Sequence, residues 1–118
     1  MSEFGLMRVL VVEDEPVVAM YLEDILDALG CVAVGPAGRL SEGLALAESE
    51  TLDAAILDIN LAGERSTPIA EALRTRGVPF AFASGYGSAP EGFAGYAPLI
   101  EKPYGTLEVQ AVLRVLLT

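Results

Sequence analysis

Three acidic residues follow two apolar runs of the chain, and their types and spacing could support chemistry on phosphate. Glu13 and Asp14 come directly after the run 9–12 (VLVV), and Asp58 comes directly after 54–57 (AAIL). If both runs are strands of one parallel sheet, all three carboxylates emerge at the same edge. Carboxylates that close repel one another, so the cluster either takes up protons or captures a cation. Oxygen ligands favour a hard ion such as Mg²⁺, which usually shares its site with a phosphate.

The pattern of apolar runs and turn residues predicts an α/β fold that would position these acids. Strands are expected over 9–12, 31–35, 53–58, 78–83 and 98–100. Helices are expected from Pro16, from about Ser41, from Thr67 and over about 106–117, with a loop at 60–63. Right-handed crossovers make this a doubly wound, flavodoxin-like, five-stranded parallel sheet of order 2-1-3-4-5. Its ligand crevice lies between the first and third strands, where the three acids stand.

Composition bounds the domain and its partners. The 118 residues suffice for a single domain, and 53% of them are hydrophobic, as expected for strands buried on both faces. No apolar stretch approaches the roughly 18 to 20 residues of a membrane span. A net charge of −10 argues against direct nucleic-acid binding, which relies on basic residues.

Two residue types limit the chemistry further. The single cysteine, Cys31, excludes an internal disulfide and predicts a reducing, cytoplasmic location. Histidine is absent, which removes most zinc sites and Ser-His-Asp hydrolysis. The domain is expected to cover residues 7–118. Residues 1–6, which precede a second methionine and show no periodicity, are expected to be a disordered or cloning-derived leader.

Four short motifs, in order at the strand ends, resemble one known family. They are V-L-V-V-E-D-E-P at 9–16, L-D-I-N-L-A-G at 57–63, Ser84, and K-P-Y at 102–104. Together they are similar to the receiver domain of two-component response regulators over nearly the whole chain after Met7. The stretch P-F-A-F-A-S-G-Y at 79–86 resembles a subgroup nicknamed for its F-A-T-G-Y motif. Receivers of that subgroup occur alone or attached to histidine kinases, chiefly in alphaproteobacteria.

The resemblance implies a metal site and its ligands. Asp14 and Asp58 would bind Mg²⁺ directly, together with the backbone carbonyl of Asn60. Glu13 would hold the ion through a water molecule. Mn²⁺ is expected as an alternative ion.

The resemblance also assigns the phosphoryl chemistry. Asp58 would be the phosphoacceptor and would attack the phosphorus of a phosphohistidine on a sensor histidine kinase or phosphotransferase. Lys102 would contact one phosphoryl oxygen as a point charge, and Ser84 would donate its hydroxyl to another. Such groups supply the positioning and charge neutralisation that phosphoryl transfer needs. A cis peptide bond between Lys102 and Pro103 would aim the lysine into the site.

Departures from the common receiver pattern predict how a signal would spread. Leu99 stands where many receivers place a switch aromatic, three positions before the lysine. Residues 85–97 hold four glycines and a proline, so we expect a weak or irregular helix there. The switch is therefore expected to be loop ordering, with Ser84 pulling on the loop and Tyr86 reporting it.

A downstream protein partner is expected on the face formed by residues 85–97, the last strand and the last helix. The domain is expected to be a monomer or a weak homodimer, with no output domain in this chain.

Two other functions compete with the phosphorylation switch. A small Mg²⁺-dependent phosphohydrolase of similar fold would need a second acid two residues after Asp58, where this chain has Asn60. A scaffolding pseudo-receiver would not need the site groups that this chain keeps. The reading favoured by the residues is a signalling switch that phosphorylates only itself and is not an enzyme.

Overall fold

Five parallel strands form the central sheet of the computed structural model, which describes residues 4–85 and 88–117. The sheet order is β2-β1-β3-β6-β7, so the predicted 2-1-3-4-5 order is confirmed. In chain order the strands are β1 (Arg8–Val12), β2 (Val32–Ala37), β3 (Ala54–Asp58), β6 (Phe80–Ser84) and β7 (Leu99–Glu101).

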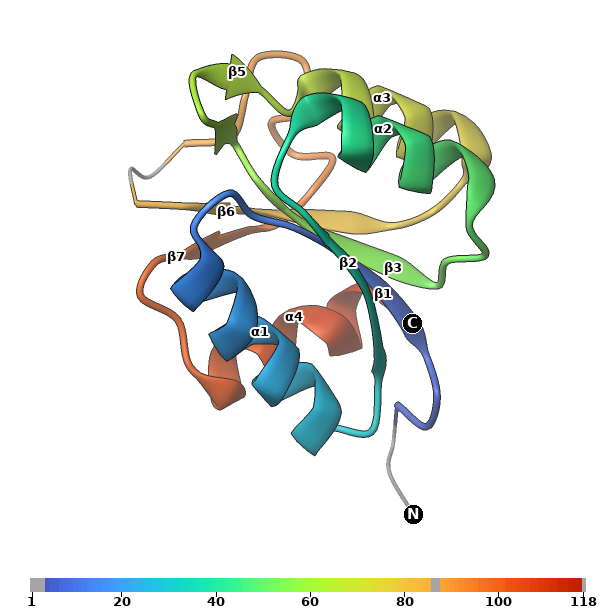
Figure 1. Ribbon diagram of the computed structural model, residues 1–118, viewed down its shortest axis with the longest axis vertical. Coiled ribbons are helices and arrows are strands. Elements are labelled where there is room, and N and C mark those ends of the chain that lie inside the picture. Colours follow the sequence, from blue (N-terminus) through green and yellow to red (C-terminus); the bar gives the residue numbers. More distant parts are fainter. Residues whose placement is uncertain (1–3, 86–87, 118) are drawn as a thin grey trace.

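Two pairs of helices cover the two faces of this sheet (Figure 1). One face carries α1 (Pro16–Ala28) and α4 (Thr106–Leu116), and the other carries α2 (Leu40–Ser49) and α3 (Thr67–Arg76). Prolines stand in the first turns of α1 and α3, where a missing N–H costs nothing. No helix among the described residues combines the length and apolar character that crossing a membrane requires.

Each central strand sends alternate side chains to opposite cores. Val9 and Val11 join the core under α1 and α4, while Leu10 and Val12 join the core under α2 and α3. All four side chains are at most 1% exposed. Burial on both faces explains why the strands are apolar runs rather than alternating patterns.

The segment after Asp58 forms a small hairpin rather than the predicted plain loop. Strand β4 (Asn60–Leu61) pairs antiparallel with β5 (Glu64–Arg65). The two turn residues, Ala62 and Gly63, have φ of 50° and 91°, as a tight two-residue hairpin turn requires. Sequence analysis missed the hairpin because only one turn residue is a glycine and each strand is two residues long.

No helix lies between β6 and β7 in the part that the structure describes, residues 88–98, which agrees with the predicted weak helix. This segment, the 88–98 loop, makes turns that are closed by hydrogen bonds between residues near in sequence. One example is the bond from the Phe93 N–H to the Pro90 carbonyl, 3.1 Å. Phe93 is 2% exposed and packs edge-on against Phe80 and Phe82. An aromatic anchor therefore replaces the packing that a helix would provide.

Arg74 on α3 holds the outer side of the 88–98 loop. Its guanidinium lies 4.3 Å from the Phe93 ring centroid and 5.0 Å from that of Tyr96. It also donates a hydrogen bond to the Gly92 carbonyl, 3.4 Å, and pairs with Glu71. These contacts connect the loop to a helix on the same face of the sheet.

The described part of the expected leader belongs to the folded domain. Phe4 is 4% exposed and packs in the core under α1 and α4. The Leu6 N–H donates to the Gly30 carbonyl, 2.8 Å. Residues 4–6 thus differ from the expected disordered segment, because an aromatic side chain fills the end of the core; residues 1–3 lie outside the described residues.

Arg74→Gln should free the 88–98 loop. Loss of the cation–π contacts, worth about 1 kcal/mol, should speed amide hydrogen exchange of residues 92–97 by about fivefold. Arg76→Gln is the matched control, because Arg76 instead donates to the Ala47 and Glu50 carbonyls. Equal exchange of 92–97 in the two variants would contradict this role of Arg74.

Candidate functional site

The ends of two neighbouring strands bring the three acids together. Val12 and Leu57 are paired at the ends of β1 and β3, so Glu13, Asp14 and Asp58 follow at one edge. One carboxylate oxygen of each acid lies within 4.8 Å of the others. The convergence expected from the sequence is therefore observed, and the roles of the acids remain predictions.

Backbone amides orient two of the carboxylates. The Ala62 N–H, at the tip of the β4–β5 hairpin, donates to Asp14 Oδ2 at 2.9 Å. The Glu15 N–H donates to Glu13 Oε2 at 3.1 Å. These two hydrogen bonds fix the orientation of both carboxylates at this edge.

Lys102 reaches the acids from the end of β7. Its Nζ lies 2.6 Å from Glu13 Oε1 and 3.2 Å from Asp58 Oδ2. The Lys102 N–H donates to the Ser84 carbonyl at 2.9 Å, and the following peptide bond to Pro103 is cis, as predicted. One ammonium thus bridges a buried glutamate and the aspartate at the end of β3.

Burial and neighbouring charges shift the pKa values of Asp58 and Lys102. Removal from water, followed by the charge of Glu13, raises the pKa of Asp58 from 3.8 to about 6, against the opposing effect of Lys102. Burial lowers the pKa of Lys102, but its hydrogen bond to Glu13 and the charge of Asp58 outweigh this and leave that pKa raised. Three acids facing one ammonium suit a divalent cation, and the all-oxygen donor set fits Mg²⁺.

An open cleft of about 320 Å³ lies over these groups and gathers most of the predicted site residues. Its lining includes Asp14, Asp58, Asn60, Ser84 and Lys102. Glu13 is absent from that lining and is 4% exposed.

One predicted switch residue, Leu99, stands apart from the cleft. Leu99 is half-buried on β7, where it pairs with Phe82 in the sheet. Tyr86 lies outside the described residues.

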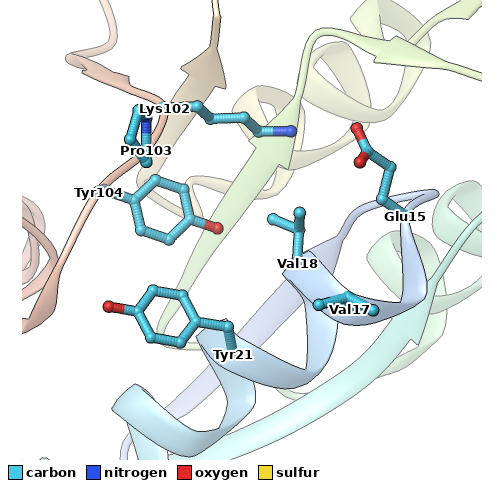
Figure 2. Close-up of a pocket in the computed structure, with 7 residues that line it drawn as sticks. All are labelled: Glu15, Val17, Val18, Tyr21, Lys102, Pro103 and Tyr104. Carbon is cyan, nitrogen blue, oxygen red and sulfur yellow. The ribbon is translucent and has the colours of Figure 1, made fainter.

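A second, apolar pocket of about 400 Å³ shares Lys102 with the site, and sequence analysis missed it. Figure 2 shows the side chains that line it: Glu15, Val17, Val18, Tyr21, Lys102, Pro103 and Tyr104. The rings of Tyr21 and Tyr104 stack with centroids 6.5 Å apart. Burial, then the charge of Glu13, raises the pKa of Tyr104 to about 12.

Exposed apolar side chains on α1 extend this pocket to the surface. Val17, Met20 and Tyr21 are 73%, 57% and 49% exposed. Their spacing of three and four residues puts them on one side of the helix, opposite the buried stripe. That second apolar stripe was the sequence signal that could have located the pocket.

Asp58→Asn should stabilise the metal-free protein at neutral pH. Because the folded pKa of Asp58 is raised to about 6, the native state holds its proton more tightly than the unfolded chain does. The resulting destabilisation is absent below about pH 4 and complete above the folded pKa. In EDTA at pH 7.5, relief of this destabilisation should raise the free energy of unfolding by about 1–2 kcal/mol. Loss of the contact with Lys102 should reduce that gain.

Urea unfolding at pH 7.5 and pH 4 measures this difference. Asp24→Asn removes the same charge from an exposed position of α1 and should change stability by less than about 0.5 kcal/mol. A gain in Asp58→Asn that is as large at pH 4 as at pH 7.5 would contradict the electrostatic origin.

Comparison with known proteins identifies the family that carries this arrangement. A family model described as response regulator receiver domain matches residues 9–113. The phyllosphere-induced regulator PhyR of Methylorubrum extorquens is 35% identical over 114 residues, which cover 90% of this chain. This chain spans only 42% of the length of that relative.

Solved structures agree with this match. The solution structure of SdrG from Sphingomonas melonis Fr1 has a TM-score of 0.84 and 43% identity, covering 96% of this chain and 98% of that chain. A BeF3-activated conformation of SdrG, from Pseudomonas melonis Fr1, has a TM-score of 0.81 and 42% identity, covering 97% and 98%. Sequence, fold and the placement of the acidic cluster therefore agree, and the chain belongs to the response regulator receiver domain family of two-component systems.

Proposed function

We propose that this receiver domain takes a phosphoryl group from a partner's phosphohistidine onto Asp58 and thereby switches its protein interactions. The observation that carries the proposal is the Lys102 ammonium, 3.2 Å from Asp58 Oδ2, beside three converging carboxylates. Receiver domains are signalling switches rather than enzymes in general, and self-phosphorylation is the only chemistry proposed for this one.

The residues divide the transfer among them. An Asp58 carboxylate oxygen attacks the phosphorus, the phosphorus–nitrogen bond breaks, and its electron pair returns to the donor's imidazole. Lys102 and the Ser84 hydroxyl hold phosphoryl oxygens while the bond exchange occurs. Glu13, 2.6 Å from the ammonium, keeps Lys102 aimed at the site.

The acidic cluster supplies the metal site of this reaction. Asp14, Asp58 and the backbone carbonyl of Asn60 would hold Mg²⁺ or Mn²⁺ directly, and Glu13 would do so through water. When bound, the ion would neutralise charge on the phosphoryl oxygens. The hydrogen bond from Ala62 fixes the direction of Asp14 before any ion arrives.

The phosphodonor docks on the apolar surface beside Lys102. The apolar pocket shares Lys102 with the cleft over Asp58 and offers exposed Val17 and Tyr21 beside it. An apolar helix of a histidine kinase or phosphotransferase fits such a surface.

A downstream protein would bind a different face. A groove of about 580 Å³ runs between β7 and α4 and is lined by apolar Leu99 and Val115 with acidic Glu101 and Glu108 at its sides. We place the output partner over this groove and the 88–98 loop. The domain would act in the cytoplasm as a monomer or weak homodimer, without binding nucleic acid or membrane; the buried thiol of Cys31 supports that location.

Two alternatives would behave differently with a small phosphodonor. A phosphohydrolase would turn over phosphoesters many times, and Asn60 in place of a second acid disfavours this. A scaffolding pseudo-receiver would not react at all, and the retained cluster of acids with Lys102 disfavours that.

Asp58 should be the sole phosphorylation site, and the reaction should need Mg²⁺. With acetyl phosphate and Mg²⁺, intact mass spectrometry should show one added phosphoryl group, about 80 Da. EDTA should abolish the adduct, and Asp58→Ala should show none. Equal labelling of Asp58→Ala and the wild type would reject the assignment, and rapid release of phosphate from small phosphoesters would favour the hydrolase.

The 88–98 loop should become better protected from amide exchange when the phosphoryl site is filled. Ser84 lines the cleft and the loop follows it closely, so capture of a phosphoryl oxygen by its hydroxyl would pull on Gly85. Beryllofluoride with Mg²⁺ should slow amide exchange of residues 88–97 by about tenfold. Leu99 offers no aromatic ring to rotate, and Tyr86 is the side chain expected to report the change.

Asp58→Ala is the matched control, because it removes the group that beryllofluoride modifies. If beryllofluoride slows amide exchange as much in Asp58→Ala as in the wild type, it acts at a site other than Asp58. Unchanged exchange in the wild type would contradict this protection of the loop even if Asp58 is phosphorylated.

A further inference from the structure

Arg65 lies at the edge of the site on the β4–β5 hairpin. Its Cα is paired with that of Asn60 across the two short strands. Residues directly opposite each other in an antiparallel pair project their side chains to the same face. The Arg65 side chain therefore shares a face with the side chain of Asn60. Asn60 is also the residue whose backbone carbonyl is proposed to bind the metal.

A second cleft joins Arg65 to the phosphoacceptor region. This cleft, about 270 Å³, is lined by Arg65, Ser84, Ile59, Asn60 and residues 88–91. Ile59, Asn60 and Ser84 also line the cleft over Asp58. Of these two clefts, Lys102 borders only the one over Asp58 and Arg65 borders only the second, while Ser84 borders both, so Ser84 lies between the cleft of each cation.

The guanidinium of Arg65 is uncommitted in an acidic protein. The chain has 17 acidic residues and 7 basic ones, so most cations have acids to pair with. Arg8 pairs with Glu50, Arg74 with Glu71, and Lys102 with two acids. Within residues 4–85 and 88–117, the Arg65 side chain has no hydrogen bond or ion pair.

A phosphoryl group on Asp58 would add negative charge that Lys102, which already pairs with Glu13, offsets only in part even beside a bound Mg²⁺. The group carries close to two negative charges in place of the single charge of the Asp58 carboxylate, in a site that already holds Glu13 and Asp14. Lys102 is held by Glu13 at 2.6 Å, which takes up part of its charge. A guanidinium can donate two parallel hydrogen bonds to phosphoryl oxygens, and the uncommitted guanidinium of Arg65 lines the second cleft.

We propose that Arg65 is a phosphoryl-binding residue, which contacts the phosphoryl group on Asp58 from the second cleft, past Ser84. The proposal rests on the phosphorylation of Asp58 proposed above. Arg65 would close over the cleft only after modification, and it would draw the hairpin toward the 88–98 loop. The site would then hold the phosphoryl group between two cations from different elements.

Titration with beryllofluoride at saturating Mg²⁺ tests the role of Arg65. Arg65→Gln should bind the ion about tenfold more weakly than the wild type, because a charge-assisted contact is lost. Arg65→Lys should recover part of the affinity. Arg114→Gln, which removes the same charge from the last turn of α4, should bind like the wild type.

Affinity for Mg²⁺ alone separates this role from a damaged site. Arg65→Gln should bind Mg²⁺ at least as tightly as the wild type does, because a nearby positive charge is gone. Beryllofluoride binding by Arg65→Gln that matches Arg114→Gln overturns the proposal. Loss of Mg²⁺ affinity in Arg65→Gln overturns it as well, because the arginine would then support the metal site itself.

The side-chain Nε–H resonance of Arg65 provides a direct readout. On adding beryllofluoride it should shift and exchange more slowly with water, and it should not respond in Asp58→Ala. An unchanged resonance in wild-type protein that binds beryllofluoride overturns the role of Arg65 alone. Failure of the wild type to bind beryllofluoride would instead refute the proposed phosphorylation of Asp58.

Discussion

Electrostatic repulsion among three carboxylates, balanced by one ammonium, governs the carboxyl edge of this sheet. Glu13 and Asp14 follow β1, and Asp58 ends β3, so the parallel topology itself forces like charges together. Lys102 offsets this repulsion by contacting Glu13 and Asp58 at once. The remaining negative charge makes the edge suited to hold a cation.

The sequence was sufficient to predict most of the architecture. Apolar runs ending in acids at 12–14 and 57–58 identified two central strands, and the turn residues between them separated the helices. Even the lack of a helix in residues 88–98, the described part before β7, followed from four glycines and a proline in residues 85–97. These features are local, and buried parallel strands have a composition that few other elements share.

The parts that escaped prediction depend on contacts distant in sequence. The burial of Phe4 depends on a gap at the end of the core, and the cation–π contacts of Arg74 depend on where the 88–98 loop lies. Arg74 is a charged residue in the last turns of a helix, where side chains are usually solvated. Nothing in the local sequence shows that it contacts Phe93. The pocket beside Lys102 likewise needs α1 and the residues after β7 to meet. Such contacts follow from the fold and cannot be read from a single segment.

The stacked tyrosines beside the site provide an intrinsic spectroscopic probe. The chain has no tryptophan and only four tyrosines, so its near-ultraviolet absorbance and emission come from very few rings. Tyr21 and Tyr104 lie against each other in the pocket that also contains Lys102. Two of the four tyrosines therefore adjoin Lys102 of the acidic site, and changes there can be followed by tyrosine absorbance or emission without attaching a dye.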